Sequence, residues 1–398
     1  MRRCYKNIFL LACLFLSACG TLDSLKESVA DATGLFSDEV DPRQPNALTE
    51  LKTALKKKVL WEVDTGVGTD QQSVNLVPAI IDSESIITAD REGLVQRRSL
   101  KSGELIWEKE LELPLSAAVG IGDFNLYVGS SNGYVAALSQ QDGSVVWKVS
   151  VPSEVLAIPR ADDSIVVVRT IDGQVLGLDE DTGEQRWSYK QPVPALSLRG
   201  TSTPALYQGA AICGFARGRL VALRLEDGLP IWQTIVAVPS GRSELDRMVD
   251  LDADPVIDDE TIFVASYQGG VAALALASGE PLWQQPDVSV HTGITLDWQA
   301  LYVSDENGDV WVLNRDNGQP FWKQDVLHFR ELTTPALYRD TLVVGDFEGY
   351  LHWLAQDDGR LLDRKKISDQ RILAKPLVLD DILYVYASDG QLTALTVK

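Results

Sequence analysis

Residues 142–147 read Asp-Gly-Ser-Val-Val-Trp, and the Gly-x-x-x-Trp pattern within them returns along the chain at a nearly constant interval. The tryptophans that end the clean copies are Trp107, Trp147, Trp187, Trp232, Trp283 and Trp322. A seventh copy carries Asp363 in the place of tryptophan. Repeats of about 40 residues that contain short alternating strands are typical of β-propellers, in which each repeat forms one four-stranded blade.

A second motif, Gly-x-[Val/Leu]-x-x-Leu, gives the number of blades. Its glycines are Gly93, Gly133, Gly173, Gly218, Gly269, Gly308, Gly349 and Gly390, and the first copy has Arg98 in the place of the leucine. Successive copies lie 40, 40, 45, 51, 39, 41 and 41 residues apart. Asp-Gly and Asn-Gly pairs recur near these motifs, and such pairs suit tight hairpins because the turn needs positive φ. The eight copies predict an all-β fold, an eight-bladed β-propeller with PQQ/WD40-like repeats.

The two ends of the repeat region indicate how the ring closes. Trp61 matches the fourth strand of a blade but has no three strands before it, and the chain ends after a third strand at residues 391–397. We therefore expect the N-terminal strand to complete the last blade, which leaves no open edge at the seam. The repeated tryptophans are expected to pack between neighbouring blades.

The first 20 residues have the pattern of an export signal. A basic start precedes a short apolar run at residues 8–16, which is too short to span a bilayer, since spanning takes about 20 residues. Small residues then lead to Cys19 and Gly20, a pattern that resembles the lipobox of bacterial lipoproteins. This resemblance implies that Cys19 carries acyl chains such as palmitate and anchors the protein to a membrane. Because Gly20 is not aspartate, the inner-membrane retention signal is absent, and we expect the outer membrane, on its periplasmic side.

These observations predict three segments. Residues 1–18 form a lipoprotein signal peptide, residues 19–58 a lipidated N-terminus and flexible tether, and residues 59–398 the propeller.

Charge and cysteine content reduce the range of possible partners and functions. The signal holds three of the 36 basic residues and none of the 57 acidic ones, so the remaining chain has 33 basic and 57 acidic residues and a net charge of −24. Such a balance argues against nucleic acid and anionic lipid surfaces as direct partners. After Cys19 the only cysteine is Cys213, so no disulfide forms within the mature chain, and its apolar surroundings predict a buried thiol.

Two stretches carry a closer resemblance to a known family. Residues 194–200 read Pro-Ala-Leu-Ser-Leu-Arg-Gly, and residues 243–252 read Ser-Glu-Leu-Asp-Arg-Met-Val-Asp-Leu-Asp. With the lipobox and the repeats, they resemble the BamB family, propeller lipoproteins of the outer-membrane β-barrel assembly (BAM) complex. The resemblance implies a scaffold that helps β-barrel proteins fold and insert into the outer membrane. It also implies that BamA is the partner, bound through a periplasmic POTRA domain, together with other BAM complex members; unfolded outer-membrane clients are a further candidate partner. By motif, the residues that face BamA are Leu196, Leu198, Arg199, Asp250 and Asp252.

The repeat spacing indicates the same region independently. From the motif tryptophan to the next motif glycine the distance is 25–27 residues in most blades, but 31 from Trp187 to Gly218 and 37 from Trp232 to Gly269. The connection after Trp61 is also long, at 32 residues. The two adjacent long connections should emerge side by side on one face, where a repeat protein often binds its partners. An apolar anchor beside an arginine is a typical hot-spot composition. Arg199 could instead pair with Asp250 or Asp252 within the chain, and this alternative stays open.

The sequence favours a binding scaffold over an enzyme. A Gly-x-Ser-x-Gly match at residues 129–133 falls in a hairpin turn rather than in the strand-to-helix turn that a nucleophile elbow needs. His291, His328 and His352 are too isolated to form a metal site. The alternative is a periplasmic quinoprotein (PQQ-type) dehydrogenase, but the adjacent cysteine pair and the haem Cys-x-x-Cys-His motif found in such enzymes are missing. We therefore predict no catalytic, cofactor-binding or metal-binding residues.

Overall fold

The computed structural model describes residues 43–52, 55–69, 76–194, 202–238 and 248–397. The chain divides into two compact units, residues 1–44 and residues 45–398, and the second unit is described here. Its regular elements within the described residues are all β-strands. No helix that could cross a membrane occurs in those residues.

The strands form eight antiparallel sheets of four, which we number as blades 1–8. Blade 1 consists of β2 (Ala79–Ile81), β3 (Ser85–Ala89), β4 (Leu94–Ser99) and β5 (Leu105–Glu110). Blade 2 consists of β6 (Gly120–Ile121), β7 (Asn125–Gly129), β8 (Tyr134–Ser139) and β9 (Val145–Ser150). Blade 3 consists of β10 (Arg160–Asp162), β11 (Ile165–Arg169), β12 (Gln174–Asp179) and β13 (Gln185–Lys190). Blade 4 consists of β14 (Ala205–Tyr207), β15 (Ala210–Phe215), β16 (Arg219–Arg224) and β17 (Pro230–Ile235).

The second half of the ring repeats this order. Blade 5 consists of β18 (Val256–Asp258), β19 (Thr261–Ser266), β20 (Gly270–Ala275) and β21 (Pro281–Gln285). Blade 6 consists of β22 (Thr295–Leu296), β23 (Ala300–Ser304), β24 (Val310–Asn314) and β25 (Pro320–Gln324). Blade 7 consists of β26 (Ala336–Tyr338), β27 (Thr341–Gly345), β28 (Tyr350–Ala355) and β29 (Leu361–Lys366). Blade 8 consists of β30 (Leu377–Leu379), β31 (Ile382–Tyr386), β32 (Gln391–Val397) and β1 (Lys57–Asp64).

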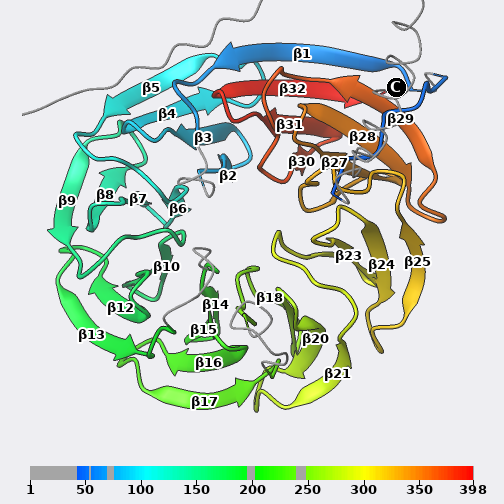
Figure 1. The fold of residues 1–398 in the computed structure, drawn as a ribbon. Helices are drawn as coiled ribbons and strands as arrows, with labels where there is room; N and C mark the ends of the chain where they lie inside the picture. Colours follow the sequence, from blue (N-terminus) through cyan, green and yellow to red (C-terminus); the bar gives the residue numbers. More distant parts are fainter. Residues whose placement is uncertain (1–42, 53–54, 70–75, 195–201, 239–247, 398) are drawn as a thin grey trace, which may run out of the picture. The chain divides into compact units, whose positions relative to one another are not determined.

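The blades surround a central opening, with the first strand of each blade innermost and the fourth outermost (Figure 1). This confirms the predicted eight-bladed β-propeller. In each blade the turns after the first and third strands lie on one rim, which we call the turn rim. The turn after the second strand and the connection to the next blade lie on the opposite rim, which we call the connection rim. The alternation follows from four antiparallel strands in sequence order.

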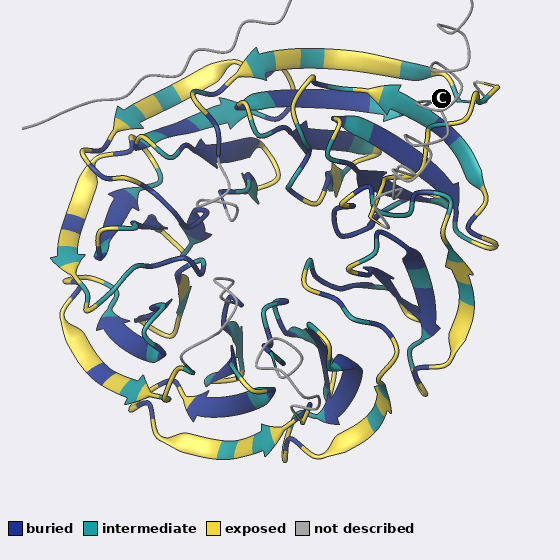
Figure 2. Ribbon diagram, viewed as in Figure 1, coloured by how far each residue is buried: buried dark blue, intermediate teal, exposed yellow. Residues whose placement is uncertain are grey.

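The core lies between the blades, on both faces of the two middle strands. In β11, for example, all five residues are buried, which is why its sequence Ile-Val-Val-Val-Arg is almost entirely apolar. The outermost strands alternate between exposed and buried or half-buried residues, as in β9 (Figure 2). Each outermost strand therefore shows period-two patterning with one face covered by a neighbouring blade.

The motif tryptophans join each blade to the next, as predicted. The indole Nε1–H of Trp283 donates to the backbone oxygen of Arg315 in blade 6 at 2.8 Å, and the six other junctions of this kind have distances of 2.8–3.1 Å. The indole ring of Trp283 packs on Gly318, where a Cβ would lie 2.5 Å from a ring carbon. Gly318 also has a φ of +70°, which glycine adopts without strain. Within this Gly-x-x-x-Trp motif, the turn glycine Gly318 contacts Trp283 of the preceding blade, and Trp322 contacts Gly359 of the next blade.

The seam also forms as predicted. β1 pairs antiparallel with β32, from Lys57 opposite Val397 to Asp64 opposite Gln391. Because β1 enters from the N-terminus, blade 8 has no turn between its third and fourth strands, and it therefore offers no turn glycine on which a tryptophan of blade 7 could pack.

Asp363 takes the tryptophan position at this junction and has another role. Its carboxylate accepts hydrogen bonds from Lys57 Nζ at 2.5 Å and from the Leu55 backbone N–H at 2.8 Å. An indole ring comes instead from Trp353, which is fully buried directly opposite Asp363 on β28. Asp363, in the place of the repeated tryptophan, therefore binds the N-terminal strand β1 and the preceding Leu55 to blade 7.

The compact unit begins before the predicted boundary at residue 59. The Asn46 N–H donates to the His328 oxygen at 3.0 Å, and the side chain of Leu48 packs between blades 6 and 7. Arg364 Nη2 donates to the Thr49 oxygen at 2.5 Å. The described residues between 45 and 56 therefore lie against the propeller. Their polar composition and their lack of strand alternation had suggested a tether.

Candidate partner-binding site

The two long connections lie on the connection rim, and they lead into β14 and β18, which are neighbours around the central opening (Figure 1). Of the first connection, residues 191–194 and 202–204 are described; of the second, residues 236–238 and 248–255. Leu196, Leu198 and Arg199, which the sequence analysis assigned to partner binding, lie outside the described residues, as does Cys19. Asp250 and Asp252 lie within them.

A direct hydrogen bond joins the ends of the two connections. The backbone N–H of Thr203 donates to Asp254 Oδ1 at 2.6 Å. Burial raises the pKa of Asp254, while this hydrogen bond acts in the opposite direction. The described ends of the two connections are therefore neighbours, as the repeat spacing predicted.

Asp250 has a structural role that the sequence analysis did not assign. In blades 1, 6 and 7 an aspartate three residues before the motif glycine accepts the N–H of the residue just before that glycine, through Asp90, Asp305 and Asp346. Blade 4 has Phe215 at that position, and Phe215 offers no acceptor. Asp250 Oδ1 accepts the equivalent N–H, from Arg217, at 3.2 Å.

This replacement has a consequence for the predicted interface. The side chain of Asp250 is buried, with 4% of the residue exposed, and its backbone oxygen accepts the Tyr267 N–H at 3.3 Å. Asp250 therefore fixes the described part of the second connection to the turn of blade 4.

Asp252 is half-buried, and its Oδ2 atom is buried without a hydrogen-bond partner among the described residues. Burial, and then the nearby negative charge of Asp250, raise the pKa of Asp252 to about 7, whereas the positive charge of Arg169 lowers it. A buried carboxylate oxygen that lacks a partner is costly, so this oxygen is available to a hydrogen-bond donor.

Arg169 is the cation of this cluster. It ends β11, is 6% exposed, and lies with its guanidinium 5.2 Å from the centre of the Phe215 ring. Burial lowers the pKa of Arg169, and the nearby acidic groups, Cys213 first and then Asp252 and Asp254, oppose that effect. Arg169 therefore lies among three aspartates, Asp250, Asp252 and Asp254, and the exposed Arg160 also acts on Asp254. Three carboxyl groups face two arginines, so the cluster favours a further positive charge.

Cys213 is buried as predicted. Burial raises the pKa of its thiol to about 12, so the thiol stays protonated and unreactive.

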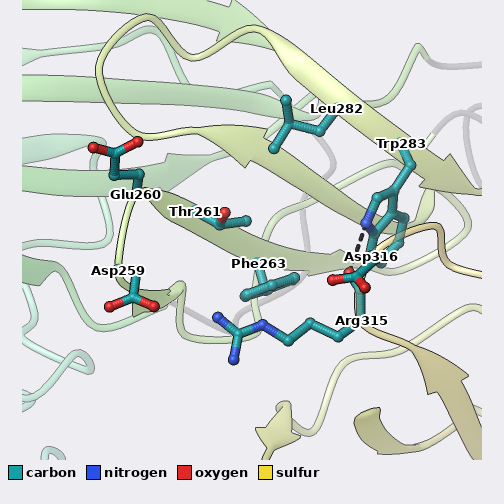
Figure 3. Close-up of a pocket in the computed structure, with 8 residues that line it drawn as sticks. All are labelled: Asp259, Glu260, Thr261, Phe263, Leu282, Trp283, Arg315 and Asp316. Carbon is teal, nitrogen blue, oxygen red and sulfur yellow. Dashed lines mark hydrogen bonds between the residues drawn. The ribbon is translucent and has the colours of Figure 1, made fainter. Parts of the chain in front are cut away.

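A pocket of about 540 Å³ lies on the turn rim, between blades 5 and 6 (Figure 3). Its wall includes Leu282, Trp283 and the acidic residues Asp259, Glu260 and Asp316. Its cation, Arg315, pairs with Asp258. The pocket lies where one blade meets the next, at a junction that the ring repeats, so its position follows from the architecture. Two adjacent long connections, in contrast, occur at blades 3 to 5, whereas the long connection from β1 to β2 has no long neighbour.

Comparison with known proteins identifies the family. A family model described as outer membrane protein assembly factor BamB matches residues 91–324 and 326–398. The outer membrane protein assembly factor BamB of Pseudomonas aeruginosa is 43% identical over 365 residues, which is 92% of this chain and 96% of that protein. The protein of the same name from Escherichia coli K12 is 34% identical and covers 94% of this chain and 97% of its own length.

Solved structures give the same result. BamB from Moraxella catarrhalis matches with a TM-score of 0.76 and 27% identity, and the match covers 86% of this chain and all of that one. A quinohemoprotein alcohol dehydrogenase from Comamonas testosteroni has a TM-score of 0.69 but only 12% identity, which is a likeness of fold alone. The near-complete matches of sequence and structure together mean that the chain belongs to the BamB family of outer membrane protein assembly factors.

Proposed function

We propose that this protein is a non-catalytic scaffold that assists the folding and insertion of β-barrel proteins into the outer membrane, and that it binds BamA through a POTRA domain. The proposed contact is the pair of long connections, with Leu196, Leu198 and Arg199 on the first. The observation that supports the proposal is the hydrogen bond from Thr203 to Asp254, because it holds the described ends of the two connections side by side.

The chemistry of the surface supports a protein partner. Leucines beside an arginine provide an apolar anchor with directional donors, and such residues often dominate binding energy. The aspartate cluster at the described ends of the connections has three carboxylates, one buried arginine, Arg169, and one exposed arginine, Arg160, which acts on Asp254. A further basic group, from the partner or from Arg199 itself, would compensate the remaining negative charge of the cluster. Asp252 is the acceptor we assign to it, because its Oδ2 is buried without a partner among the described residues.

The anchor is a separate part of the proposal. Removal of residues 1–18 and acylation of Cys19 would hold the protein on the periplasmic side of the outer membrane. A Cys19→Ser variant should move from the membrane fraction to the soluble periplasmic fraction, and fractionation with an antibody measures this. A variant that stays with the membrane after a high-salt wash would contradict the assignment.

The interface is tested by binding of the purified protein to the POTRA domains of BamA. Leu198→Ala and Arg199→Ala should each weaken binding by about 2 kcal/mol, the usual size of a hot-spot loss. Leu282→Ala is a matched control, because Leu282 is 58% exposed but lies at the turn-rim pocket. Unchanged affinity in both test variants would overturn the proposed site.

Two further measurements sharpen the result. A double-mutant cycle between Arg199 and Asp252, measured on unfolding and on binding, separates an ion pair within the chain from one with the partner. Crosslinking from position 198 in cells should capture BamA, and it also reports whether unfolded outer-membrane clients bind there. Capture of neither would contradict the proposal.

A further inference from the structure

Arg169 is unusual for its place in the repeat. It stands four residues before the motif glycine, where six other blades have a small residue: Ala89, Gly129, Gly214, Ala265, Ser304 and Gly345. The space there is tight because the connection to the next blade passes over it. A Cβ on Gly129 would lie 2.4 Å from Val155, and one on Gly345 would lie 2.5 Å from Ile372. In these blades, the position therefore has no space for a large side chain.

Arg169 binds the described end of the first long connection. Arg169 Nη1 donates to the Ser202 backbone oxygen at 3.0 Å and to Ser202 Oγ at 2.8 Å. The stack of its guanidinium on Phe215 fixes the direction of the side chain. Ser202 is 1% exposed and comes directly after residues 195–201.

The next residue is fixed from the other side. Thr203 is bonded to Asp254 of the second connection, so two consecutive residues are held by different blades: Ser202 by blade 3 and Thr203 by the segment that leads into blade 5. The guanidinium that holds Ser202 is charged, and hydrogen bonds to charged groups are stronger than neutral ones.

We propose that Arg169 is a positioning residue for partner binding, which sets the described end of the first connection relative to the described end of the second. This inference rests on the proposed function. Arg169 is too deeply buried to be part of the contact itself, so it acts through Ser202.

The test compares Arg169→Met, Arg169→Lys and Ser202→Ala with Arg330→Met. Arg330 is a matched control because it is also a buried arginine, 3% exposed, that pairs with Asp346 and lies 5.1 Å from the centre of a phenylalanine ring, but it lies in the connection from blade 6 to blade 7. Affinity for the POTRA domains of BamA and the melting temperature are measured for each variant.

Arg169→Met should weaken binding about tenfold, a size that residues without contact to the ligand can reach. Arg169→Lys, which keeps the charge and one donor, should recover part of the affinity. Arg330→Met should lower the melting temperature and leave the affinity unchanged, and that contrast separates positioning from a general loss of stability. Hydrogen exchange in Arg169→Met should increase at residues 202–204 and 248–255 and stay unchanged in β31.

Arg199→Ala, measured in parallel, separates the two hypotheses. If Arg199→Ala weakens binding and Arg169→Met does not, the inference is wrong and the proposed function stands. If neither Arg199→Ala nor Leu198→Ala weakens binding, the proposed site fails and the inference fails with it. If Arg169→Met does not fold, Arg169→Lys and Ser202→Ala decide the question: wild-type affinity in both would overturn the inference, and weaker binding in either would support it.

Discussion

Replacing Asp363 with alanine should destabilise the propeller at its seam. The side chain of Asp363 is 3% exposed and that of Lys57 is 10% exposed, so their ion pair is almost entirely removed from water. Deleting one partner of a buried pair costs about 3–5 kcal/mol, and leaving the Leu55 N–H without its acceptor costs about 1–3 kcal/mol. Because the strand can partly relax outward, we expect a total of about 4 kcal/mol.

Urea unfolding measures this loss, and a double-mutant cycle with Lys57→Met isolates the pair. We expect a coupling energy of about 2 kcal/mol between the two side chains. Arg224→Ala is the control: Arg224 pairs with Asp227 at 3.4 Å, but both side chains are well exposed, so its loss should cost about 0.5 kcal/mol. A loss below about 1 kcal/mol in Asp363→Ala would refute the reasoning.

The pH dependence gives a second signature of the same pair. Burial alone would raise the pKa of Asp363, but the hydrogen bonds from Lys57 and the backbone prevail and lower it from its ordinary value of 3.8. A carboxyl group with a lowered pKa stabilises the fold above its unfolded pKa, and the stabilisation is lost as the pH falls through the folded value. The difference between wild type and Asp363→Asn should therefore shrink as the pH drops below about 4.

Two further predictions concern the site and the blade junctions. The pKa of Asp252, raised from 3.8 to about 7, means that its charge opposes folding as the pH rises through this window, so Asp252→Asn should stabilise the protein by about 2 kcal/mol or more near pH 8. The gain should vanish at about pH 3.5, and an equal gain at both pH values in urea unfolding would contradict the assignment. Gly318→Ala should cost about 3 kcal/mol, because its Cβ would meet the ring of Trp283 and its φ is +70°. Gly209→Ala is the control, since its φ is +74° with open space around the added carbon, and a loss as large as that of Gly318→Ala would show that backbone strain alone is responsible.

The fold could be predicted from the sequence because each repeat carries the same local chemistry. A turn glycine, an outer-strand tryptophan and two short apolar strands recur along the chain with small variations. A substitution in one copy therefore does not hide the repeat, because the other copies still show it. Asp363 appeared only as a defect in this pattern. Its role depends on Lys57, which the chain brings to it from the far end, and no local pattern reports such a contact.

The site was predicted in part. The length of the two connections indicated that they are neighbours, and the bond from Thr203 to Asp254 agrees for the described residues. Asp250 was expected to face a partner but supplies the acceptor that Phe215 lacks, and only an alignment of the turns reveals this substitution. Arg169 was missed, although a signal existed: a charged residue stands where six blades have a small one.

The pairing of β1 with β32 has a consequence for how the chain folds. The two strands come from opposite ends of the sequence, so the ring closes only after all other blades are available, and such non-local pairing slows folding. Until closure, blade 8 exposes an unpaired edge, and such an edge can accept an equivalent strand from another copy. A β-barrel meets the same difficulty, since it too is complete only when its first and last strands pair.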